Sequence, residues 1–86
     1  MLSIDELIRE VSSIKVDSDQ LSTMIASAGT SLSSQSNTLA GLVRGSRTGQ
    51  DAVMALSVAA RSMSNAAASM KTLSRTCDQC VANLSK

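Results

Sequence analysis

Apolar residues recur along the first half of the chain in alternating steps of three and four. Counted from Ile4, these steps select Ile4, Leu7, Val11, Ile14, Ser18, Leu21, Ile25, Ala28, Leu32, Gln35, Leu39 and Leu42. Only Ser18 and Gln35 in this series are polar. A sustained pattern of this kind predicts a helix with an apolar seam that packs against another helix.

The second half of the chain repeats the pattern. The selected positions are Val53, Leu56, Ala60, Met63, Ala67, Met70, Ser74, Cys77, Val81 and Leu84, of which only Ser74 is polar. Proline is absent and good helix formers are frequent, so propensity agrees with periodicity. We therefore predict two long helices.

A glycine-rich turn separates the two runs. Glycine ends helices and supplies positive φ, so Gly41, Gly45 and Gly49 place the turn near residues 41–49. Gly45 followed by Ser46, or Thr48 acting as an N-cap, would end one helix and start the next. A short turn folds the helices back on each other, so the fold class is all-α, an antiparallel hairpin over residues 16–86. The turn residues are Val43, Gly45 and Gly49.

Residues 1–15 form an amphipathic amino-terminal segment with two interpretations. Asp17 or Ser18 could cap a new helix that contains Leu21 and Ile25. The segment is then separate; otherwise it continues into the first helix. We favour a break.

The composition indicates that a second chain completes the fold. A chain of 86 residues hides only about 60–65% of its unfolded surface, and this one has no Phe, Tyr or Trp to enlarge its core. We expect a helical partner chain, or a second copy, to complete a bundle. The expected partner-binding residues are Leu21, Ile25, Leu32, Leu39, Leu42, Val53, Leu56, Met63, Met70, Cys77, Val81 and Leu84.

Charge is distributed unevenly around a net value of +1. Residues 1–20 carry Asp5, Glu6, Glu10, Asp17 and Asp19 against Arg9 and Lys15, whereas residues 44–86 carry Arg44, Arg47, Arg61, Lys71, Arg75 and Lys86 against Asp51 and Asp78. The asymmetry could orient an antiparallel or head-to-tail contact. With no basic cluster and no aromatic to stack on a base, the chain is not expected to bind nucleic acid.

The segment from Gln20 to Val43 contains no charge, but it is interrupted by polar residues and glycine. It therefore lacks the roughly 20 predominantly apolar residues of a membrane span. The amino terminus, Met1 to Glu6, is acidic where a signal peptide is basic, so we expect any export to follow a signal-peptide-independent route from the cytoplasm to the cell surface or medium.

No residue pattern indicates catalysis. Cys77 and Cys80 are three apart, and helical spacing favours packing of Cys77 in the seam over a redox pair, a disulfide or a metal site. Asp5, Glu6 and Glu10 read as a solvated face. The chain has no His, and no serine has a base in motif spacing, so we expect no enzyme activity, no metal and no cofactor.

The layout resembles the Esx-like, Trp-x-Gly helical hairpins of type VII secretion systems. The segment Ile14–Leu21 is similar to the opening phrase of that superfamily, and Val43-Arg44-Gly45 stands where its Trp-x-Gly turn would be, without the tryptophan. The serine-rich middle looks more like the tryptophan-less branch that accompanies LXG-domain toxins in Gram-positive bacteria. The family's carboxyl-terminal aromatic is missing, because Thr76, Cys77 and Asp78 stand there, which leaves the export signal to a partner.

This resemblance implies a small adaptor that binds the helical amino-terminal domain of a secreted toxin and promotes its type VII export. Two alternatives remain open at this point. One is a self-assembling hairpin subunit of a needle or rod, for which the size and helix content are suitable. The other is a membrane-active helical protein, suggested by the uncharged stretch.

Overall fold

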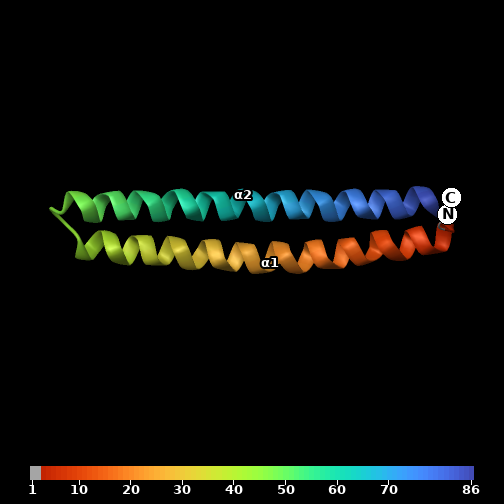
Figure 1. Cartoon of the computed structure of the whole chain (residues 1–86), viewed down its shortest axis with the longest axis horizontal. Coiled ribbons are helices and arrows are strands. Elements are labelled where there is room, and N and C mark those ends of the chain that lie inside the picture. Colours follow the sequence, from red (N-terminus) through yellow and green to blue (C-terminus); the bar gives the residue numbers. More distant parts are fainter. Residues whose placement is uncertain (1–2) are drawn as a thin grey trace.

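The structure, a computed structural model, consists of two long helices. It describes residues 3–86; Met1 and Leu2, which open the expected amino-terminal segment, lie outside the described residues. Helix α1 spans Ile4–Leu42 and helix α2 spans Arg47–Leu84, and they run antiparallel along their whole length (Figure 1). The predicted all-α hairpin is confirmed, in the shape of a rod 63 × 19 × 13 Å.

Serine caps begin both helices. The Ser3 hydroxyl accepts a hydrogen bond from the backbone N–H of Glu6 at 3.2 Å, and the Ser46 hydroxyl accepts one from the N–H of Gly49 at 3.1 Å. Each cap satisfies a backbone donor that the first helical turn leaves without a partner. Of the two predicted caps for the second helix, Ser46 rather than Thr48 takes the position.

The turn needs glycine at two positions for different reasons. Gly45 has a φ of 80°, in the left-handed region that residues with a side chain rarely adopt. Gly49 already belongs to α2, and a Cβ there would overlap the side chain of Val43, which folds over it. The chain therefore reverses between Val43 and Ser46, within the predicted turn.

The expected break at residues 16–19 is wrong. Helix α1 continues through this segment, with Asp17 exposed and Ser18 buried (Figure 1). The Ser18 hydroxyl donates to the carbonyl oxygen of Ile14 at 2.7 Å, one turn back in the same helix. Because this bond satisfies the hydroxyl inside the helix, the serine does not need the non-helical backbone of a cap.

The seam between the helices uses the predicted positions of α2 but only half of those of α1. Along α2 the residues against α1 follow the expected series from Val53 to Leu84. Along α1 the row Val11, Ser18, Ile25, Leu32 and Leu39 also lies where expected. The alternate row is shifted by one residue and consists of Lys15, Ser22, Gly29, Ser36 and Val43 in place of Ile14, Leu21, Ala28, Gln35 and Leu42.

Close approach of the two backbones explains the shift. A Cβ added to Gly29 would lie 3.2 Å from the Cβ of Met63 and 3.4 Å from the carbonyl oxygen of Ala60. The Ser22 hydroxyl donates to the carbonyl oxygen of Ala67 at 3.0 Å. Larger side chains would hold the helices apart, because the distance between helix axes depends on the side chains at the contact.

A second serine bonds across the seam nearer the turn. The Ser36 hydroxyl lies 3.3 Å from the carbonyl oxygen of Val53, to which it donates, and 3.0 Å from the Ser57 hydroxyl. Both crossing serines are buried, and hydrogen bonding offsets the cost of removing their hydroxyls from water. The seam is therefore narrow and partly polar.

The two glycines at 41 and 49 predict opposite responses to the same substitution. Gly49→Ala should lower the free energy of unfolding by about 1–3 kcal/mol, because its methyl group overlaps Val43. Gly41→Ala should raise it by up to about 1 kcal/mol, because Gly41 is helical with nothing within 4 Å of an added Cβ. Urea denaturation followed by far-UV circular dichroism measures both. Equal effects of the two substitutions would contradict the described turn.

Candidate functional site

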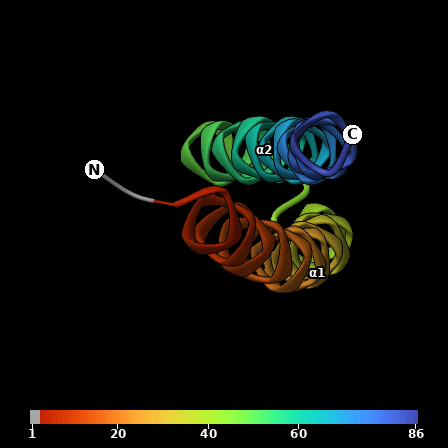
Figure 2. The same ribbon diagram turned by 90° about the vertical axis from the view of Figure 1, so that its right-hand side faces the viewer.

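One long side of the hairpin carries an uncovered row of apolar residues from each helix. Each of these residues directly precedes a seam residue, so the two rows flank the seam on one side of an antiparallel pair. We call this surface the open face; it consists of Leu7, Ile14, Leu21, Ala28, Gln35 and Leu42 of α1 with Ala52, Ala59, Ala66, Leu73 and Cys80 of α2. Viewed along the rod, the two helices lie side by side and neither flank is covered (Figure 2).

The large residues of the open face are substantially exposed. The exposed fraction is 45% for both Ile14 and Leu21, 40% for Leu73 and 78% for Leu42. The remaining members of the two rows are small or uncharged, so the face contains no charged side chain. Single exposed apolar residues are ordinary, but contiguous rows of them indicate an interaction surface.

The open face is hollowed near the turn. A groove of about 390 Å³ lies between the helices there, with Gln35, Leu39 and Leu42 of α1 on one side and Leu56 of α2 on the other. Its apolar lining suits an aliphatic side chain from another molecule.

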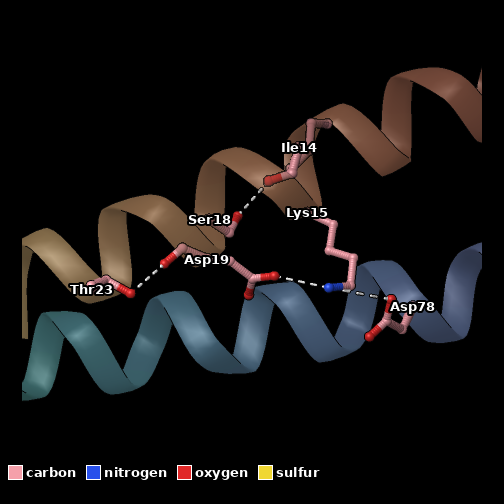
Figure 3. A network of polar contacts seen from close by, with 6 residues as sticks. All are labelled: Ile14, Lys15, Ser18, Asp19, Thr23 and Asp78. Atoms are coloured by element: carbon pink, nitrogen blue, oxygen red, sulfur yellow. Dashed lines mark hydrogen bonds and ion pairs between the residues drawn. The ribbon is translucent and has the colours of Figure 1, made fainter.

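The opposite side of the hairpin is polar. The ammonium nitrogen of Lys15 lies 2.8 Å from Oδ2 of Asp19 on its own helix and 3.9 Å from Oδ1 of Asp78 on α2 (Figure 3). The hollows on this side, of about 500 and 380 Å³, are lined mainly by alanine, serine and threonine, with Lys71 and Arg61 at their edges. The two long sides therefore differ in chemistry.

This ion pair shifts the titration of both partners. The hydrogen bond from Lys15 lowers the pKa of Asp19 below its ordinary value of 3.8, and the Ser74 hydroxyl lowers it further. The same hydrogen bond, together with the negative charges of Asp19 and Asp78, raises the pKa of Lys15 above 10.5. Lys15 thus reaches out of the seam to join the two helices on the polar side.

The hairpin exposes more surface than a typical monomer of its mass. A folded monomer of 8.9 kDa has an accessible surface of about 4,800 Å², whereas this chain exposes 6201 Å². The excess is about 1,400 Å². The buried apolar residues are Ala60, Ala67 and Cys77, and no large side chain among residues 3–86 is fully buried. The interior is therefore thin, and much of the apolar material lies outside it.

Charge separates along the length of the rod. We define the terminal part as residues 1–19 with 78–86, which carries a net charge of −3, and the loop part as residues 20–77, which carries +4. Folding brings the acidic amino-terminal segment beside the carboxyl end of α2, as Figure 1 shows. One end of the molecule is consequently acidic and the other basic.

The structure divides the expected partner-binding residues into two groups. Leu21 and Leu42 lie on the open face. The other expected residues lie in the seam of the chain's own hairpin, and they are Ile25, Leu32, Leu39, Val53, Leu56, Met63, Met70, Cys77, Val81 and Leu84. Their role in binding a partner stays a prediction, with one edge of each already against the other helix.

The pattern missed Ala52, Ala59, Ala66, Leu73 and Cys80 as a surface row. A signal was present in their regular spacing of seven, immediately before the seam series of α2. Cys77 is buried in the seam, while Cys80 is exposed on the open face, and neither forms a disulfide in the structure. No group of three or more potential metal ligands gathers within residues 3–86.

Neither helix, over the residues described, is long and apolar enough to cross a membrane. No family model matches the chain, and comparison with curated proteins and with solved structures found no match.

The Lys15–Asp19 pair predicts a pH dependence of stability. The folded-state pKa of Asp19 is lowered, so its contribution is present above its unfolded value of 3.8 and is lost as the pH falls through the folded value. The folded-state pKa of Lys15 is raised, so its contribution is present below 10.5 and is lost as the pH rises through the folded value. Thermal unfolding should shift least between about pH 5 and 9.

Asp19→Asn should reduce the loss of melting temperature in acid. Asp17→Asn, which changes an exposed carboxylate two residues earlier, is the matched control and should leave that loss unchanged. Thermal melts followed by circular dichroism across the acid range compare the two. If both variants follow the wild-type curve, Asp19 contributes nothing to the acid limb.

Proposed function

We propose that this protein is a non-catalytic helical adaptor whose open face packs against helices of another chain to complete a bundle. The single observation that carries the proposal is the uncharged double row of exposed apolar residues. Burying such a surface supplies about 25 cal/mol per Å², and a four-helix bundle is the simplest arrangement that covers it.

The thin interior supports the same conclusion. A hairpin with an excess of about 1,400 Å² of exposed surface has an unusually small stabilising interior for its length. A partner that binds only the folded hairpin raises its stability by mass action. The area is also of the size that specific interfaces bury, about 800 Å² from each partner.

The resemblance to Esx-like hairpins supplies the biological setting of the proposal. The partner is then the amino-terminal helical domain of a secreted LXG-type toxin, and the adaptor promotes its type VII export. The position of Val43-Arg44-Gly45 at the reversal of the chain is compatible with that setting. On this proposal the adaptor covers an apolar face of the toxin's helices and keeps it soluble before export.

Substitution on the open face should abolish toxin binding without unfolding the hairpin. Leu21→Asp should weaken binding of an LXG-type amino-terminal domain from the same genome by about 100-fold or more, because the complex loses an apolar contact and buries an unpaired carboxylate. Calorimetry with the purified toxin domain measures the affinity, and circular dichroism checks that helicity is retained.

Val58→Asp is the matched control, because Val58 is 54% exposed on the side of α2 that faces away from the seam. It should bind like the wild type. The proposal fails if the wild-type protein does not bind the toxin domain. It fails equally if Leu21→Asp and Val58→Asp weaken binding to the same extent.

A further inference from the structure

We propose that, when no toxin is bound, the open face takes a second copy of this chain in the antiparallel direction and forms a closed four-helix dimer. In this dimer the turn of each copy lies over the chain termini of the other, α1 lies along α1 and α2 along α2. The inference rests on the face used by the proposed function, but it does not depend on the identity of the toxin.

Charge decides the direction of stacking. The antiparallel arrangement places the terminal part, with its net charge of −3, over the loop part of the other copy, with +4. The parallel arrangement places like charge over like charge at both ends. Complementary potentials fix the register and orientation of an interface, and they do so although salt screens them over about 8–10 Å.

Side-chain size agrees with charge. The bulky aliphatic residues Leu7, Ile14 and Leu21 of the open face occupy the terminal half of α1, whereas Ala28 follows them toward the turn. On α2 the order is the same in space, because Leu73 lies toward the termini and Ala59 toward the turn. Antiparallel stacking therefore sets large residues of one copy over small residues of the other, which allows close packing.

The groove near the turn finds its occupant in this arrangement. Leu7 and Leu39 are equally far from the middle of α1, which spans Ile4–Leu42. When two α1 helices run antiparallel across a twofold axis, Leu7 of one copy thus lies opposite the groove at Leu39, Leu42 and Leu56 of the other. Leu7 is 36% exposed and available to enter it.

The symmetry makes the assembly closed. Each copy offers one bulky end and one groove, and the twofold arrangement uses both, so no binding element is left to recruit a third copy. The long side of the rod measures 63 by 19 Å, or about 1,200 Å². This exceeds the roughly 800 Å² per partner of a standard interface.

The first test is the mass of the isolated protein by light scattering with refractive-index detection, because the chain has no Tyr or Trp. We expect twice the 8.9 kDa of one chain, with a fall toward the monomer mass in the Leu21→Asp variant. The Val58→Asp variant should remain dimeric. A helical wild-type monomer at micromolar concentration, or a filament, overturns the inference.

The second test reports the direction through the native Cys80. Cys80 and an introduced Ala52→Cys lie 28 residues apart on one helix, about 42 Å, and cannot bond within a chain. They are equally far from the middle of α2, so the antiparallel dimer places residue 52 of one copy over Cys80 of the other.

Oxidation with glutathione disulfide, in a Cys77→Ala background, should convert Ala52→Cys to dimers joined by two 52–80 disulfides, which peptide mapping identifies. Val58→Cys in the same background is the control and should give no 58–80 link. Dimers that lack the 52–80 link overturn the antiparallel direction.

Neither test includes the toxin, so its outcome is independent of the proposed function. A monomer that binds the toxin domain removes only the dimer. A dimer that ignores the toxin domain removes only the adaptor. Where both hold, adding the toxin domain should convert the dimer into a mixed complex, because both compete for the open face.

Discussion

The close approach of two helical backbones is the interaction on which the rest of this structure depends. It is made possible by Gly29 against Ala60, and by serine hydroxyls that donate across the seam to carbonyl oxygens of the facing helix. Small residues bring the helices together but contribute little apolar area. The seam is consequently specific in register and modest in hydrophobic stabilisation.

A narrow seam leaves the larger aliphatic side chains without a place inside. Leu21, for example, directly precedes the buried Ser22 and is turned to the outside by that neighbour's position in the seam. The same relation repeats at Ile14 and Lys15. The open face is therefore a direct consequence of how the hairpin packs, and the polar side, with its Lys15–Asp19–Asp78 cluster, is the other consequence.

These two unlike sides give the molecule a physical basis for binding. An uncharged apolar side favours helices of another chain, while the opposite polar side keeps the rod compatible with water. The separation of charge along the rod adds direction to that preference. A module of this form needs no catalytic group, since its chemistry consists of covering surface.

The sequence by itself determined the helices, their antiparallel order and the turn. Alternating steps of three and four predict helical seams, and Gly45 followed by Ser46 marks the reversal, because both signals are local in the chain. Only the tertiary structure decided which row of α1 enters the seam and that α1 continues through Ser18. The apolar pattern favoured Ile14 and Leu21, but closeness to α2 selected Lys15 and Ser22. That choice depends on the size of the facing residues and on hydrogen bonds between helices, which hydrophobic periodicity along one helix does not encode.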